Sequence, residues 1–557
     1  MKLAKISIMI ITMLSLILSS ACGAGTNKGA DSTASTGASS GQTSQQATGP
    51  ADPFGKYTPP IEVSTINTTI TTDVRFPEGD SPENNIWTRT YLEELGIKLN
   101  LLWSCGDDKA EEKRNLMIAS GDLPDVFTVS RNQFDQLNNA GKLEDLTQVF
   151  EKYASPFVKD FIYRDGGIAM KSAQKDGKLY AIPFFLDYTE STSILWIRTD
   201  WLEKLKIPEP KTMEDVFKIA EAFKDRDPDG NGKPDTYGIP MTKNLIGSSF
   251  FNAFHAYPSI WIKDSSGSLV FGATKPEMKA ALLKLQEFYK NGIIPKEFGV
   301  MDDNKYIEDV LSNKFGVVFG GLWDPWYPMQ LIKDKDPSYQ LKAFAVPSID
   351  SVPASVEVPG LNILNYLVVK KGAKFPEALI KMVNVNAEKN FGETSDVNKY
   401  NIEAATGNSV YRMSPVYVEP PRKNYYVYKH IAEALDNKDE SKLNSEEKQY
   451  YGNILKYMQG DNSHWFEERC YGPEGSCSII DDYLNNKSYK LNEFTGIPTA
   501  TMLEKGAVLD KLYKETVTRI IMGADISEFD AYVEKWKKLG GDEMTKEVND
   551  WYTSQNN

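Results

Sequence analysis

The sequence has few histidines and cysteines and no excess of basic residues. Its 557 residues include three histidines and four cysteines, and 63 lysines and arginines stand against 77 aspartates and glutamates, a formal net charge of −14. So little histidine argues against a zinc enzyme or a histidine-based triad, and four cysteines are too few for a disulfide scaffold. Because nucleic-acid-binding domains carry a basic surface, we expect no nucleic-acid partner.

Long hydrophobic runs are absent after the first twenty residues. Two lysines precede a mostly apolar run over 6–18. This run is shorter than the roughly 20 residues that cross a bilayer, and it has the pattern of a secretory signal peptide. Small residues at 19–21 lead into Cys22 and resemble a bacterial lipobox, although serine stands where leucine is usual. We therefore expect a signal peptide over 1–21 and a lipidated Cys22. An ordinary secretory signal with a chance cysteine is the alternative.

Residues 23–50 contain no aromatic residue and no Val, Ile or Leu. Gly, Ser, Thr and Ala make up 21 of these 28 residues. Such a segment cannot bury enough apolar surface to offset the entropy of ordering it, so we expect 22–56 to be a flexible tether spanning about 30 Å. The protein is thus expected at the outer face of the cytoplasmic membrane, anchored by lipid.

The rest of the chain alternates amphipathic helices with short apolar strands. Capping-box patterns predict helices that begin at Thr212 and Thr274, and the second is expected to stop at Gly292. A further apolar stripe over 529–539 closes on a pair of glycines. Strand-like runs lie at 97–103, 125–129, 179–185, 316–319, 343–346 and 366–369. This alternation predicts an α/β fold with largely buried sheets.

One loop, 225–238, carries the oxygen pattern of a calcium site. Its sequence is DRDPDGNGKPDTYG, which fits the EF-hand register when Asp227 is position 1. The expected ligands are the side chains of Asp227, Asp229, Asn231 and Asp235 and the carbonyl of Lys233. Position 12 is a glycine, so the usual bidentate glutamate is missing. Oxygen-only ligation favours a structural Ca²⁺ ion. A register starting at Asp225 and a solvated turn without metal are the alternatives.

Cys470 and Cys477 flank the turn-rich segment YGPEGS. In an exported protein this spacing favours a small disulfide loop, with two unpaired thiols as the alternative. Cys105 is left over, and we expect it to be a buried small side chain.

Aromatic residues gather in loops that follow predicted strands. Trp323, Trp326 and Tyr327 follow one strand and two glycines, Trp103 ends another strand, and Phe254 lies in a third aromatic group. Flat rings suit the C–H faces of sugars, and ligands of α/β proteins gather beyond the carboxyl ends of strands. We expect these five residues to contact a carbohydrate. The alternative is that most of them pack in the core or between lobes.

Several motifs together resemble one protein family. They are SGDLPD at 120–125, DGKLYAIP at 176–183, IRTDWLEKL at 197–205, IIMG at 520–523 and WKKLGG at 536–541. This combination is similar to carbohydrate-type extracellular solute-binding proteins, in the large lipid-anchored branch, over about 57–552. The branch has a Ca²⁺ loop at the position of Asp227–Asp235. Thr236 stands where some relatives have an acidic residue, which leaves one calcium ligand unassigned.

The resemblance implies two α/β lobes of the periplasmic-binding-protein type, joined by a hinge and closing over a ligand in the interlobe cleft. By analogy, lobe one is 57–187 plus 345–415, and lobe two is 188–344 plus 416–557. The protein is then expected to capture a carbohydrate, in particular an oligosaccharide, and to deliver it to an ABC permease. It would act as a monomer and without chemistry, since closure over the ligand is sufficient.

The body of the chain lacks the common catalytic motifs: it has no G-x-S-x-G, P-loop, HExxH or dinucleotide-binding fingerprint. The 77 acidic residues still supply many candidate pairs for a glycosidase. A carbohydrate-active surface enzyme and a glycan-sensing or adhesion lipoprotein are therefore the alternatives to transport.

Overall fold

The computed structural model describes residues 52–71, 74–186, 192–245, 247–360, 362–403, 406–496 and 498–556. The predicted signal peptide, Cys22 and most of the predicted tether lie outside these residues. None of the helices in the described ranges is long and apolar enough to cross a membrane.

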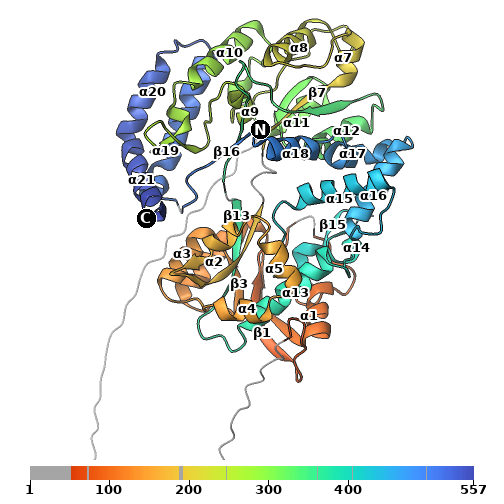
Figure 1. Ribbon diagram of the computed structural model, residues 1–557, viewed down its shortest axis with the longest axis vertical. Coiled ribbons are helices and arrows are strands. Elements are labelled where there is room, and N and C mark those ends of the chain that lie inside the picture. Colours follow the sequence, from red (N-terminus) through yellow and green to blue (C-terminus); the bar gives the residue numbers. More distant parts are fainter. Residues whose placement is uncertain are drawn as a thin grey trace, which may run out of the picture. The chain divides into compact units, whose positions relative to one another are not determined.

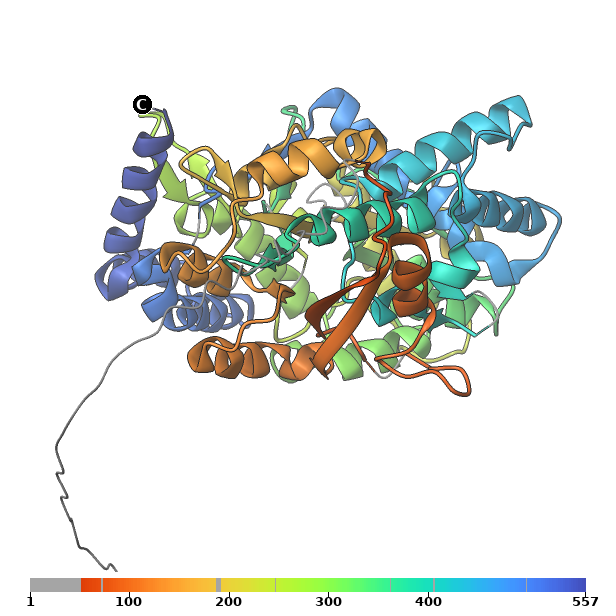
Figure 2. The same ribbon diagram turned by 90° about the horizontal axis from the view of Figure 1, so that it is seen from below.

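Two small sheets with helices against them form the first lobe (Figure 1). Strand β13 (Asn362–Val369) lies between β3 (Val126–Val129) and β6 (Ala181–Leu186) and is antiparallel to both. Strands β1 (Ile61–Asn67) and β2 (Ile97–Ser104) form a parallel pair, drawn in red and orange in Figure 2. The remaining elements of this lobe are α1 (Ile86–Leu95), α2 (Asp107–Ser120), α3 (Arg131–Asn139), α4 (Thr147–Tyr153), α5 (Pro156–Ile162), α6 (Ile168–Ser172), β4 (Gln174–Lys175), β5 (Lys178–Leu179), α13 (Glu377–Phe391), α14 (Val397–Tyr400), β14 (Ile402–Glu403) and β15 (Asn408–Ser409).

Antiparallel strands also form the central sheet of the second lobe. Strand β7 (Ile194–Arg198), buried at every residue, lies between β10 (Val317–Gly320) and β11 (Leu341–Phe344). The helices of this lobe are α7 (Thr199–Leu205), α8 (Met213–Asp225), α9 (Ser248–Asn252), α10 (Met278–Asn291), α11 (Asp303–Leu311), α12 (Gln330–Lys333), α15 (Lys423–Asn437), α16 (Ser445–Met458), α17 (Trp465–Tyr471), α18 (Ser476–Asn486), α19 (Ala500–Ile521), α20 (Glu528–Trp536) and α21 (Asp542–Asn556). Strands β8 (Trp261–Lys263) and β9 (Leu269–Phe271) pair as a hairpin beside them.

Buried hydrophobic residues fall into separate cores. One core joins residues between Tyr57 and Ile182 to residues between Tyr366 and Val418, so two distant stretches of chain build the first lobe. The other two cores draw on residues between 194 and 356 and between 427 and 548. Where the chain passes between lobes, β12 (Val356–Val358) pairs in parallel with β16 (Tyr489–Leu491). The predicted two-lobe α/β fold is confirmed, and the lobe boundaries at 187/188, 344/345 and 415/416 stay predictions.

Local signals predicted some helix ends correctly and others wrongly. Thr212 caps α8 with its side-chain oxygen and forms the predicted capping box, and Gly292 ends α10 in the left-handed conformation. The capping box predicted at Thr274 is wrong, because the hydroxyl of Thr274 donates to the Phe271 carbonyl at 2.7 Å and α10 begins only at Met278. The four helices α15–α18, which pack around the candidate site described next, were not predicted.

Candidate functional site

The segment Gly321–Tyr327, which follows β10, presents three aromatic side chains to solvent. Trp196 of β7 donates its indole N–H to the Gly321 carbonyl at 2.9 Å. Ser476 Oγ and Cys470 Sγ both donate to the Leu322 carbonyl, at 3.1 and 3.4 Å. These donors come from three different elements of the second lobe, so the start of the loop, at Gly321 and Leu322, is held to the body of the lobe.

The rings of this loop remain exposed although its backbone is fixed. Trp323, Trp326 and Tyr327 keep 38, 58 and 51% of their surface accessible. The rings of Trp323 and Trp326 lie edge to face with centroids 6.5 Å apart. Exposing three large aromatic rings on one short segment has no benefit for folding, whereas such rings are efficient contact surfaces for a ligand with apolar faces. We call Trp323, Trp326 and Tyr327 the aromatic platform.

A second layer of aromatic residues supports the platform. Tyr471 of α17 meets Trp323 edge to face at 6.0 Å and stacks on Tyr450 of α16 at 4.8 Å. The Tyr471 hydroxyl donates to the side chain of Asn424 at 2.7 Å. Helices α15–α17 therefore set the angle at which Trp323 stands. Sequence reasoning missed Tyr471, because nothing in the local sequence separates it from the chain's other tyrosines.

Asp324 is a poorly solvated carboxyl group within the platform loop. Its Oδ2 accepts the Gly321 N–H at 3.1 Å, and a Cβ on Gly320 would lie only 1.7 Å from that oxygen, so the carboxyl packs directly on glycine backbone. Burial raises the pKa of Asp324 to about 7, which the single backbone hydrogen bond only partly offsets. No cation pairs with this carboxyl among the described residues.

The Asp324→Asn variant should be more stable than the parent at pH 8 and about equally stable near pH 4. Ionisation of Asp324 costs the folded state more than the unfolded state, so the parent loses stability as the pH rises from about 4 to about 7. Asparagine keeps an oxygen for the Gly321 N–H and has no proton to lose. We expect a gain of about 2–4 kcal/mol at pH 8, from roughly 1.4 kcal/mol per pKa unit. Denaturant unfolding at the two pH values measures it.

Asp336→Asn is the matched control, and its stability at pH 8 should change in the opposite direction. The Asp336 carboxylate accepts hydrogen bonds from the Ser338 hydroxyl and N–H, at 2.5 and 2.9 Å, and these bonds hold its pKa below the ordinary value. This variant should therefore lose stability at pH 8 relative to the parent. A change of the same sign in both variants would contradict our assignment of Asp324.

The other two predicted sugar contacts lie elsewhere. Trp103, the last residue but one of β2, packs against the core of the first lobe, and the ammonium group of Lys113 lies 5.3 Å from its ring. Phe254 is a core residue, only 8% exposed, with its ring stacked on Phe217 of α8 at 6.3 Å. The ring of Phe254 thus packs inward on α8, which the local sequence does not indicate, and its contact with a carbohydrate stays a prediction.

The predicted calcium loop brings its acidic side chains together. The Asp227 carboxylate accepts the N–H groups of Gly230 and Asn231, both at 3.1 Å, and of Gly232 at 3.0 Å. The Asn231 amide nitrogen lies between two further carboxylates and donates to Asp229 at 2.6 Å and to Asp235 at 3.1 Å. Hydrogen bonds through Asn231 therefore join Asp229 to Asp235, although no three His, Cys, Asp or Glu residues in the described ranges are arranged to hold a metal ion.

The electrostatics of this loop fit a divalent cation. Burial and a hydrogen bond with Asp227 raise the pKa of Asp229, and the same hydrogen bond is the largest cause that lowers the pKa of Asp227. Two carboxyl groups this close repel each other when both are ionised, and a cation bound between them would relieve that repulsion. Loaded with Ca²⁺, the loop would offer oxygens from Asp227, Asp229, Asn231 and Asp235. The Asn231 side chain would have to turn its oxygen inward.

The loop ends differently from a complete EF-hand. Thr236 is buried, and its hydroxyl donates to the Phe223 carbonyl of α8 at 2.8 Å. A Cβ on Gly238, at position 12, would lie 2.5 Å from the Ala220 carbonyl, so no side chain fits there. Close packing of the loop exit on α8 explains why the bidentate glutamate is missing.

Cys470 and Cys477 do not form the predicted disulfide. They lie on separate helices, α17 and α18, and both are buried thiols. The Cys470 thiol donates to the Leu322 carbonyl, and the Cys477 thiol donates to the Asn424 carbonyl at 3.8 Å. The turn between the two helices directs each thiol to a different partner. For this reason the predicted disulfide is absent between Cys470 and Cys477. Cys105 is half-buried rather than buried.

Comparison with known proteins places the chain in a family. The sequence model of the bacterial extracellular solute-binding proteins matches residues 77–388, more than half of the chain. Lipoprotein LipO of Bacillus subtilis is 26% identical over 85% of this chain and 90% of its own length. The polygalacturonan/rhamnogalacturonan-binding protein YtcQ of the same species is 24% identical over 82% and 86%.

A solved structure shares the fold. It is that of the S. pneumoniae ABC-transporter substrate-binding protein FusA, an EF-hand mutant in complex with fructo-nystose, with a TM-score of 0.58 and 19% identity over 89% of this chain and 99% of that one. The family match, two relatives similar along most of their length and the shared two-lobe fold agree. The chain belongs to the bacterial extracellular solute-binding proteins.

Proposed function

We propose that the protein is a lipid-anchored solute-binding protein that captures an oligosaccharide outside the membrane and delivers it to an ABC permease. The observation that carries the proposal is the aromatic platform, in which three exposed rings follow a loop start that Trp196, Cys470 and Ser476 hold by hydrogen bonds. A fixed platform binds sugar faces without the entropy loss of ordering a loop. The protein acts as a monomer with two lobes that close over the ligand, and it catalyses no reaction.

The similar proteins support a carbohydrate ligand. YtcQ is a polygalacturonan/rhamnogalacturonan-binding protein, and FusA is the substrate-binding protein of a fructooligosaccharide ABC transporter. The EF-hand of FusA supports a structural Ca²⁺ in the loop Asp227–Asp235 here. The experiment is a thermal-shift screen of neutral and uronic-acid oligosaccharides, with fructan and galacturonan fragments included. At least one should raise Tm in a dose-dependent manner, and no shift with any of them would count against the proposal.

Lipid anchoring is tested at Cys22. The Cys22→Ala variant should appear in the culture medium or periplasm while the body of the protein still folds, because lipid on this residue is the proposed membrane attachment. Cell fractionation followed by a carbonate wash measures the distribution of the variant and of the parent. If the variant stays with washed membranes as fully as the parent, the lipid anchor is not at Cys22.

A second candidate function is a carbohydrate-active surface enzyme. It predicts that a sugar found in the screen is cleaved on incubation with the protein, so chromatography of the sugar after the assay distinguishes the two functions.

A further inference from the structure

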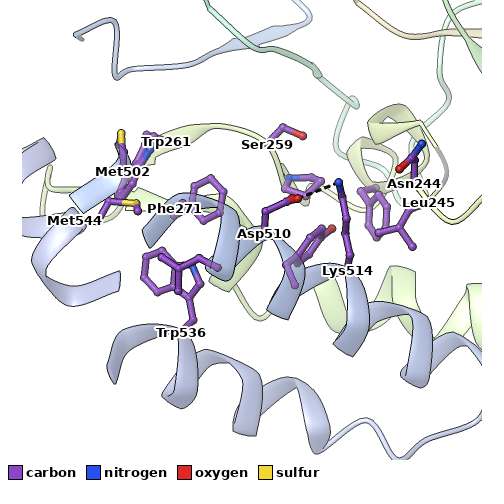
Figure 3. Close-up of a pocket in the computed structure, with 15 residues that line it drawn as sticks. Asn244, Leu245, Ser259, Trp261, Phe271, Met502, Asp510, Lys514, Trp536 and Met544 are labelled. Atoms are coloured by element: carbon purple, nitrogen blue, oxygen red, sulfur yellow. Dashed lines mark ion pairs between the residues drawn. The ribbon is translucent and has the colours of Figure 1, made fainter. Parts of the chain in front are cut away.

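A cavity of about 480 Å³ lies within the second lobe, apart from the aromatic platform (Figure 3). Its walls are the β8–β9 hairpin and the C-terminal helices α19, α20 and α21. The volume lies within the range of small-molecule sites. No predicted site residue lines this cavity, so the functions considered so far leave it unexplained.

One end of the cavity is strongly apolar. Phe271 lies between two tryptophan rings, stacked on Trp536 at 5.8 Å with 12° between the planes and 5.4 Å from Trp261. Met502 and Met544 complete this end, as Figure 3 shows. Flat rings and adaptable thioethers suit an aromatic or aliphatic group. A sugar ring with all its hydroxyls would leave them without partners at this end, at a high desolvation cost.

The other end carries the polar groups. Asp510 and Lys514, one turn apart on α19, form an ion pair at 3.0 Å, and Asn244 and Ser259 line the cavity near them. Carboxylate, ammonium, amide and hydroxyl groups together supply the donors and acceptors that sugar hydroxyls need. The cavity is therefore amphipathic along its length.

The cavity is also linked to the strand that leads into the aromatic platform. Leu245 lines the cavity, and two residues later Gly247 packs on the Phe319 carbonyl of β10, where a Cβ would approach to 2.5 Å. β10 continues directly into the platform loop.

A glycine in the middle of α19 keeps the cavity wall open. Gly506 lines the cavity inside a 22-residue helix, and a Cβ built there meets nothing within 4 Å. Glycine is the weakest helix former after proline, so its place in a helix interior is unfavourable for folding alone. Its missing side chain leaves space that a ligand can fill.

We propose that this cavity binds a glycoside that carries an apolar substituent, such as an aryl or acyl group, with the substituent among Trp261, Phe271 and Trp536 and the sugar at the Asp510–Lys514 end. The inference rests on the proposed carbohydrate function and adds that the protein prefers a substituted sugar to the unsubstituted one.

The test compares matched methyl and phenyl β-glycosides of glucose, galactose and xylose. The mature protein is titrated with each, followed by tryptophan fluorescence and calorimetry. At least one phenyl glycoside should bind about tenfold more tightly than its methyl partner. Gly506→Leu should abolish this preference by filling the cavity, and its Tm should not fall, since leucine is the better helix former.

Gly452→Leu is the matched control. Gly452 also lies inside a helix, α16, and a Cβ there also meets nothing within 4 Å, but it does not line this cavity. The control should keep the phenyl preference. If Gly506→Leu does not fold, Met502→Trp narrows the same end and should have the same effect on binding.

Three results would overturn the inference: no saturable binding of any phenyl glycoside, equal affinity for phenyl and methyl forms, or a preference that survives in Gly506→Leu and Met502→Trp. Failure of the proposed function looks different. If oligosaccharides bind through the platform and phenyl glycosides show no preference, only the cavity inference fails. If phenyl glycosides fill the cavity and no oligosaccharide binds, the proposed transport function fails.

Discussion

Removing calcium should lower the Tm of the parent protein and leave that of the Asp229→Ala variant unchanged. Asp227 accepts three backbone N–H groups of this turn, and Asn231 donates to both Asp229 and Asp235, so one short loop holds all three carboxyl groups. A cation that binds only the folded loop stabilises the protein by RT ln(1 + [L]/Kd), about 2.7 kcal/mol when calcium is at 100 Kd. Without Asp229, two acidic ligands remain and affinity falls steeply. Thermal unfolding with and without chelator measures the effect.

Asp264→Ala is the control for this experiment. Asp264 also caps an exposed turn, with its carboxylate accepting the N–H groups of Ser266 and Ser268 at 2.8 and 3.1 Å, but no second carboxyl group shares its turn. This variant should respond to chelator as the parent does. Equal shifts in the parent and Asp229→Ala, or no shift in the parent, would mean that the loop is a solvated turn without metal.

Replacing a platform tryptophan should weaken sugar binding far more than folding. Trp323→Ala and Trp326→Ala each remove an exposed ring at the proposed centre of contact, where such anchors contribute about 2 kcal/mol or more, a thirtyfold loss of affinity. Folding should suffer less than the 3–5 kcal/mol typical of a buried tryptophan, since both rings are substantially exposed. Calorimetric titration with the best sugar from the screen, together with thermal unfolding, measures both.

Tyr163→Ala is the control for loss of an exposed ring. Tyr163 follows α5 in the first lobe, is 41% exposed and lies outside the platform. The Tyr163→Ala variant should bind the sugar with parental affinity. Trp326→Phe, which keeps a ring, should bind it more tightly than Trp326→Ala. Full affinity in both tryptophan-to-alanine variants would remove the platform from the binding site.

Features that depend on neighbouring residues were predictable from the sequence. The capping box at Thr212 and the left-handed end at Gly292 follow from local chemistry. The strand at 97–103 begins with alternating apolar and polar residues, and the one at 366–369 is an apolar run. The place of Trp323, Trp326 and Tyr327 after a strand was predictable, since they follow the end of β10, and their contact with a sugar stays a prediction.

Features that depend on distant residues were not. Phe254 is buried by Phe217, 37 residues away in sequence, and the partners of Cys470 and Cys477 come from the platform loop and α15. The raised pKa of Asp324 results from burial by the surrounding lobe. The spacing of residues in one sequence does not indicate such contacts between distant residues. It does indicate hydrogen bonds between residues a few positions apart, such as those that cap a helix.

The central claim is that the protein binds an oligosaccharide and leaves it intact. The most direct measurement is a calorimetric titration of the mature protein with the best sugar from the screen, followed by chromatography of the recovered sugar. We predict saturable binding of one ligand per chain and full recovery of the unaltered oligosaccharide. Cleavage of the sugar during the titration, or no saturable binding of any oligosaccharide in the screen, would contradict the claim.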